Sequence, residues 1–150
     1  MSFLSKIFAK KPAYVHPVFG TMTFVNAGAG RSYWEGHADF APANATIEVF
    51  VDGDESGVAS RAEDFYAEIQ TRYSSIVALF RPEMDRRMIE LSKERVPESF
   101  EDAYRLSSVS VVDTTIRKDW TLGFDCLFDD GFSISIELSD WEHGVVVVDS

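Results

Sequence analysis

The chain has 150 residues, about one domain, and 45% of them are hydrophobic, which supplies a core and excludes intrinsic disorder. Its 14 basic and 25 acidic residues give a net charge of −11, which makes nucleic acids and anionic membranes unfavourable partners. The C-terminal third is the most acidic part, because residues 97–150 hold 3 basic and 12 acidic side chains.

The N-terminal residues predict a short amphipathic helix. Apolar residues recur at helical spacing from Phe3 to Phe8, lysines lie between and after them, and Pro12 ends the segment. We expect this helix over residues 1–12, followed by a single α+β domain over residues 13–150. The helix is predicted to dock on the domain or on a partner; contact of residues 1–11 with lipid is the alternative.

The first half of the domain reads as strands followed by a long helix. Apolar alternation predicts strands over residues 19–25, 31–40 and 46–51, with a bulge near Gly36. Apolar residues three or four apart then mark a helix from Phe65 to Phe80. Ser60 and Glu63 match a capping box at its start, and Pro82 is expected to end it.

Two shorter helical segments follow, one over residues 84–91 and one that begins at Pro97 and extends to Tyr104. Strands return over residues 109–116, 120–128, 132–138 and 145–148. We therefore predict an α+β fold: an antiparallel sheet of six or seven strands with two or three helices on one face.

In the hairpin between residues 120 and 138, the register is predicted from the requirement that the large apolar residues of both strands are buried on one face. A three-residue loop, Asp129 to Gly131, pairs Phe124 with Ile136 and keeps the large apolar side chains on one face. This pairing predicts a positive φ at Gly131. Cys126 falls on the same apolar face, where a serine hydroxyl would be buried without a partner.

The segment from Asp52 to Glu63 resembles the spacing of an EF-hand calcium loop. Asp52, Asp54, Ser56 and Glu63 fall at ligand positions 1, 3, 5 and 12, with Gly57 at position 6. A strand precedes the segment and no second loop pairs with it. The alternative interpretation is a connector in which these residues form a turn and Ser60 caps the helix. Calcium is the only cofactor that the sequence suggests.

No catalytic motif is present in the sequence. The three histidines are not spaced with one another or with Cys126 as zinc ligands, and no nucleophile elbow or phosphate-binding loop occurs. We therefore expect a protein that is not an enzyme. The lone cysteine, the missing signal peptide and the absence of an apolar run of ~18 residues predict a cytoplasmic protein.

Acidic residues gather along the last hairpin and the loop after it, and we expect Trp141 to be exposed among them. An aromatic side chain among carboxylates is typical of a surface that binds a basic protein; the alternative is a polar sheet face that keeps the protein soluble. The predicted partner-binding residues are Asp125, Asp129, Asp130, Asp140, Trp141 and Glu142.

Phe19-Gly20, Trp34-Glu35-Gly36 and the Phe128–Gly131 turn are similar to those of a group of small bacterial domains. Most of these domains have no assigned role, and some are encoded near polymorphic toxins and are thought to act as immunity proteins. The resemblance covers residues 17–80 and 107–150 and implies no catalytic residue. We thus expect a protein-binding module, such as an immunity or adaptor protein; a calcium-binding or small-molecule-binding protein that uses residues 52–63 is the alternative.

Overall fold

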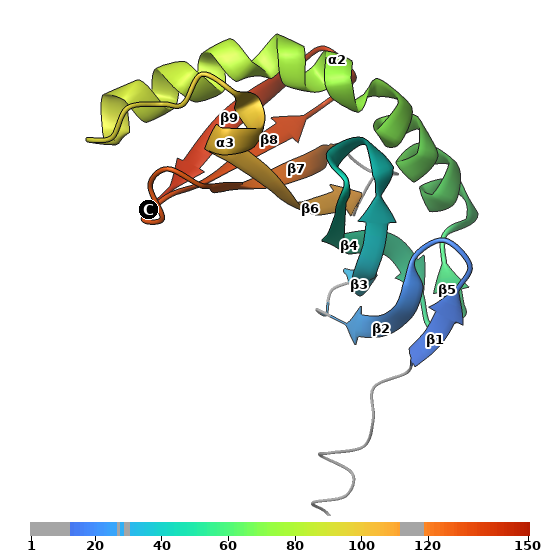
Figure 1. The fold of residues 1–150 in the computed structure, drawn as a ribbon. Coiled ribbons are helices and arrows are strands. Elements are labelled where there is room, and N and C mark those ends of the chain that lie inside the picture. Colours follow the sequence, from blue (N-terminus) through green and yellow to red (C-terminus); the bar gives the residue numbers. More distant parts are fainter. Residues whose placement is uncertain (1–12, 27, 29–30, 112–118) are drawn as a thin grey trace, which may run out of the picture.

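The computed structural model describes residues 13–26, 28, 31–111 and 119–150, so the helix predicted over residues 1–12 lies outside the described residues. Within the described ranges the chain is an α+β protein with a nine-stranded sheet and one long helix (Figure 1). The strands are β1 (Ala13–His16), β2 (Gly20–Asn26), β3 (Ser32–Phe40), β4 (Ala45–Asp54), β5 (Gly57–Val58), β6 (Tyr104–Val111), β7 (Trp120–Cys126), β8 (Ser133–Leu138) and β9 (Gly144–Asp149). The helices are η1 (Ala41–Ala43), α2 (Ser60–Leu91) and α3 (Phe100–Ala103).

The sheet consists of two antiparallel units that meet at one parallel pair. Its strand order is β1-β2-β3-β4-β6-β7-β8-β9, and β5 pairs with β4 outside this path. β4 and β6 run parallel from the Glu48–Ser108 pair to the Val51–Val111 pair, so the prediction of an entirely antiparallel sheet is wrong here. The cause is α2, which follows β4 and carries the chain back, so that β6 starts in the same direction as β4.

The core lies between α2 and one face of the sheet (Figure 1). Alternate residues of each strand face the helix; in β7 they are the buried Trp120, Leu122, Phe124 and Cys126. The helix contributes the matching buried stripe Ala62, Tyr66, Ile69, Tyr73, Ile76, Phe80, Met84 and Met88. We call the other side of the sheet the open face, because no described helix covers it.

α2 is longer than the sequence predicts. It continues through Pro82 to Leu91 as one helix of 32 residues. Pro82 is exposed, and the buried stripe passes it without interruption from Phe80 to Met84, so packing outweighs the lost backbone hydrogen bond. The predicted capping box is also wrong: the N-cap is Ala59, and no side chain caps the helix.

The β7–β8 hairpin has the predicted faces and a different register. Phe124 pairs with Ile134 instead of Ile136, which shifts the strands by two residues and leaves both apolar rows on the core side. Gly131 does not adopt the predicted positive φ. The turn is held instead by the carboxylate of Asp129, which accepts from the Ser92 hydroxyl at 2.6 Å and the Gly131 N–H at 3.3 Å.

Gly36 is not a bulge, because it pairs regularly with Met22 and Val49. A Cβ there would lie 2.5 Å from the Met22 sulfur, so the close packing of β2 on β3 requires glycine. The register shift in this sheet lies between Leu106 and Ser108 of β6. α3 is a single turn that ends at Ala103, before the Tyr104 that the sequence assigns to it.

Candidate functional site

The residues predicted as calcium ligands form the β4–β5 hairpin and the first turn of α2. Asp52 is buried and its carboxylate lies 3.3 Å from the Arg61 guanidinium. Asp54 accepts from the Ser56 N–H at 2.9 Å and the Ser56 hydroxyl at 2.5 Å, and these bonds lower the pKa of the Asp54 carboxyl. Glu63 faces His16 at 3.9 Å. Each predicted ligand side chain therefore lies next to a partner from the protein.

Neighbouring strands fix the backbone of the same hairpin. The Trp34 indole N–H donates to the Asp54 carbonyl at 2.9 Å, and the Val58 N–H donates to the Tyr14 hydroxyl at 2.8 Å. A Cβ on Gly53 would lie 2.4 Å from the Gly57 carbonyl oxygen and 2.6 Å from the Trp34 ring. In the described part of the chain, no three His, Cys, Asp or Glu side chains are grouped to hold a metal. These contacts support the connector interpretation of the segment.

The predicted partner-binding residues lie at opposite ends of β8. Asp125 pairs with Arg105 at 2.9 Å, and Asp129 binds Ser92 at the end of α2. Asp130 is exposed beside them. Trp141 and its two acidic neighbours follow the far end of β8, roughly 20 Å away for a strand of six residues. The structure therefore does not bring these six residues into one surface.

Trp141 is half-buried, which corrects its predicted exposure. Its ring stacks on Phe65 of α2 with centroids 5.2 Å apart and contacts Trp120 at 5.3 Å. The Arg72 guanidinium lies 4.6 Å from the centre of the Trp141 ring. Phe65 belongs to the helical apolar stripe in the sequence, whereas Arg72 and Trp141 are so far apart in the chain that no local pattern links them.

Residues 139–143, which we call the Trp141 loop, are ordered by Asp140. Its carboxylate accepts from the Glu142 N–H at 2.8 Å and the His143 N–H at 2.7 Å. The His143 ring nitrogen Nδ1 lies 2.8 Å from the second oxygen. The two backbone donors and His143 lower the pKa of the Asp140 carboxyl. Asp140 and His143 therefore shape the loop.

Three hollows adjoin the Trp141 loop. The first, of about 280 Å³, lies between the start of α2 and Trp120 and has mostly apolar walls. The second, of about 570 Å³, lies between Leu79 and Arg72 of α2 and the loop. The third, of about 610 Å³, opens on the open face beside Ser110, Thr121 and Glu137. Recessed surface therefore lies next to Asp140, Trp141 and Glu142.

The side chains of Cys126 and His16 are held by contacts within the protein. Burial raises the pKa of the Cys126 thiol, and the N–H groups of Phe128 and Asp129 point at its sulfur. A serine at this position would therefore have backbone donors, which removes the reason for the predicted cost of Cys126→Ser. His16 accepts from the Val18 N–H at 3.1 Å within its own turn.

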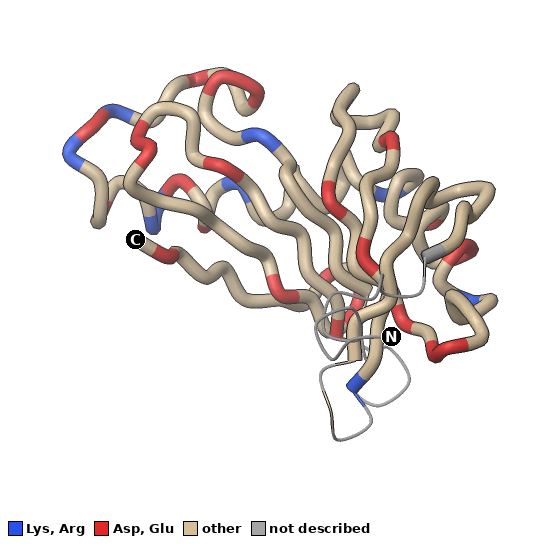
Figure 2. Tube along the Cα trace, turned by 90° about the horizontal axis from the view of Figure 1, so that it is seen from below, with Lys and Arg blue, Asp and Glu red and all other residues tan. Residues whose placement is uncertain are grey.

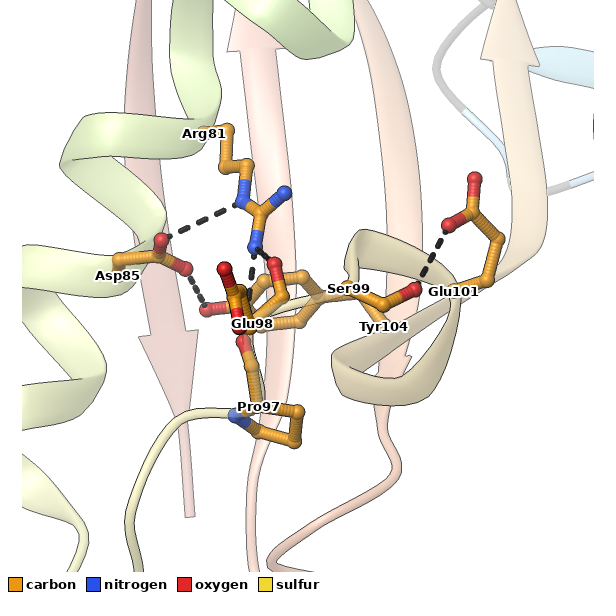
Figure 3. A network of polar contacts seen from close by, with 7 residues as sticks. All are labelled: Arg81, Asp85, Pro97, Glu98, Ser99, Glu101 and Tyr104. Atoms are coloured by element: carbon orange, nitrogen blue, oxygen red, sulfur yellow. Dashed lines mark hydrogen bonds and ion pairs between the residues drawn. The ribbon is translucent and has the colours of Figure 1, made fainter.

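A polar network links α2 to the start of β6 (Figure 3). The Tyr104 hydroxyl donates to Asp85 at 2.7 Å, and the Arg81 Nε lies 3.4 Å from the other Asp85 oxygen. Arg81 also donates to the backbone carbonyls of Pro97 and Glu98. Burial and the Asp85 carboxylate raise the pKa of Tyr104, so its phenol stays protonated at neutral pH. The network ties the segment after α2 back onto the helix.

A scan against protein-family models, a search of curated proteins and a search of solved structures each found no match to this chain. The resemblance to toxin-associated bacterial domains therefore stays a prediction. No described helix is long and apolar enough to cross a membrane.

Proposed function

We propose that this protein is a non-catalytic module that binds a second protein with a basic surface, in the role of an immunity or adaptor protein. The charge of the open face is the observation that carries the proposal. Beyond Asp52, which is bound by Arg61 of α2, and Asp54, which is bound by Ser56, six carboxylates lie on this face along the described strands, and Arg105 is the only lysine or arginine among them. The six are Glu35, Asp39, Glu48, Asp125, Glu137 and Asp149.

Figure 2 views the molecule from below the sheet, and acidic positions are distributed over both halves. Arg105 is already paired with Asp125. Glu48 and Glu137 are exposed and have no ion-pair partner among the described residues. A surface with unpaired charges of one sign raises the association rate of an oppositely charged protein.

Hydroxyl side chains lie between several of these carboxylates. Across the strands, Phe50 is followed by Ser110, Thr121 and Glu137 in one row of paired residues. The hydroxyls of Ser110 and Thr121 offer hydrogen bonds along this row, beside the open hollow of about 610 Å³ that they and Glu137 line. Such a surface fits a protein contact better than catalysis.

Affinity capture from the native cell, at low and moderate salt, tests the proposal. We expect a basic protein to be retained by the native chain and lost with the double variant Glu48→Lys/Glu137→Lys. A matched control, Asp64→Lys/Glu94→Lys, makes the same charge change at exposed positions off the open face and should retain the partner. Equal loss with both variants, or no basic protein at either salt, contradicts the proposal.

A further inference from the structure

The free edge of β9 differs from the opposite edge of the sheet. β9 ends the strand order, so the backbone groups on its outer side have no strand partner among the described residues. Exposed edges are usually protected by proline, lysine or short length. The other edge, β1, has four residues and lies between Pro12 and Pro17. β9 has six residues, four of them valine, and neither proline nor lysine.

Apolar side chains are exposed on both sides of the β9 edge. Val145 is 62% exposed on the open face, and Leu79 of α2 is 51% exposed. Leu79 and Ile76 line the hollow of about 570 Å³ that ends at His143, directly before β9. A strand placed along β9 would thus meet valine on one side and the wall of α2 on the other. Main-chain pairing with apolar contacts on alternate side chains is the pattern of β-strand addition.

The acidic residues around this edge favour an added strand that carries basic side chains. From residue 119 to residue 150 the chain contains no lysine or arginine. Its eight acidic residues in this stretch are Asp119, Asp125, Asp129, Asp130, Glu137, Asp140, Glu142 and Asp149. Two copies of this edge would repel each other, whereas lysine or arginine on an added strand would lie near Glu137 and Asp149.

We propose that β9 is a docking edge that accepts an extended segment of a partner protein, in which β-branched apolar residues alternate with lysine or arginine. The proposal rests on the proposed function and assigns it a surface. The segment pairs antiparallel or parallel with β9 as an additional strand of the sheet. Its apolar side chains pack toward Leu79 on the helix side, and its basic side chains lie over the open face.

The test uses the full chain and a synthetic peptide of alternating lysine and valine, with a glutamate–valine peptide as the charge control. We expect the lysine peptide to bind, more weakly as salt rises, and to slow amide hydrogen exchange in residues 144–149. Val145→Lys should weaken binding by about tenfold or more through charge repulsion. Val15→Lys, an exposed valine on the other edge strand, should leave binding unchanged.

Three outcomes would overturn the proposal: protection of amides elsewhere than β9, equal weakening by both variants, or equal binding of the two peptides. Dimerisation of the free chain that Val145→Lys abolishes would identify a second copy as the occupant and would also overturn it. Circular dichroism of each variant shows whether weaker binding comes from the substituted edge or from unfolding of the protein. If the basic protein captured from the native cell is lost with Glu48→Lys/Glu137→Lys but retained with Val145→Lys, the docking edge is wrong and the proposed function stands.

Discussion

The two faces of the sheet are built from the same strands and differ in almost every property. In β7, Trp120, Leu122 and Phe124 are at most 2% exposed on the core face, whereas Thr121 and Asp125 on the open face are half-buried. The core face is apolar and packed against α2; the open face holds hydroxyls and carboxylates. Alternation along a strand therefore places the residues that stabilise the core and the residues that we propose for partner binding on opposite faces.

The largest expected effect tests this separation on one strand. We expect Phe124→Ala to lower the free energy of unfolding by about 3–5 kcal/mol, because it removes a fully buried ring from the core. Thr121→Ala, three residues away on the open face, should change it by less than about 0.5 kcal/mol. Urea unfolding of both variants measures the difference. Similar losses in the two would mean that the open face is also part of a packed interior.

Glycine substitutions extend the comparison to the backbone. Gly53→Ala should cost about 1–3 kcal/mol, because its Cβ would lie 2.6 Å from the Trp34 ring and 2.4 Å from a carbonyl oxygen. Gly131→Ala is the matched control, since its Cβ would meet only Asp129, at 3.5 Å, and its φ is not positive. Thermal unfolding should show a clear loss for the first and almost none for the second. A large loss of stability for Gly131→Ala would indicate that Gly131 adopts the positive φ that the sequence predicts.

Alkaline pH tests the core through the buried tyrosines that α2 packs against the core face. Burial raises the pKa of Tyr66 and of Tyr73 to about 12. Between pH 10 and 12 the unfolded chain therefore releases these phenol protons while the folded chain retains them, so the free energy of unfolding falls as pH rises. We expect Tyr66→Phe to lessen this fall by about 1–2 kcal/mol. Urea unfolding at pH 9 and pH 11 gives the comparison, and an unchanged fall would contradict it.

The smallest expected effect lies at the Trp141 loop. The lowered pKa of Asp140 means that the ordered loop is stabilised above the ordinary carboxyl pKa of about 4 and loses this stabilisation as pH falls below it. Tryptophan fluorescence should change over this range in the native chain, since Trp141 lies in the loop. Asp140→Ala should show already at pH 7 the fluorescence that the native chain shows at low pH. Asp140→Asn, which keeps an acceptor oxygen, should show a smaller change. Signals from both variants that match the native signal at pH 7 would contradict this prediction.

Alternation in the sequence was sufficient to predict seven of the nine described strands, β6 only in part, and the faces of the β7–β8 hairpin. It could not determine which residues pair, because a shift of two residues preserves every face. β1 and β5 were missed because two to four residues are too few for a pattern. Pro82 does not end the helix as the sequence predicts, since the buried stripe on both sides of it packs on a sheet that forms from distant segments.

The candidate site was predicted less well than the fold. Asp125 and Asp140 are close in sequence, but β8 extends between them and separates their surroundings. Trp141 appeared exposed because its acidic neighbours are, while its actual contacts, Phe65 and Arg72, come from α2. The open face could not be recognised as one surface until the parallel β4–β6 pair fixed the order of the strands.

The parallel pairing of β4 with β6 also bears on how the chain assembles. Every other strand neighbour in the sheet is a neighbour in the chain, so hairpins can form locally, whereas this one contact must close the long connection that contains α2. We expect the amides of strands β1–β5 and of strands β6–β9 to gain protection from hydrogen exchange early in refolding. The β4–β6 pair that joins the two groups of strands should form last. A chain cut after residue 95 would then yield two complementary fragments that recover the native circular dichroism spectrum on mixing.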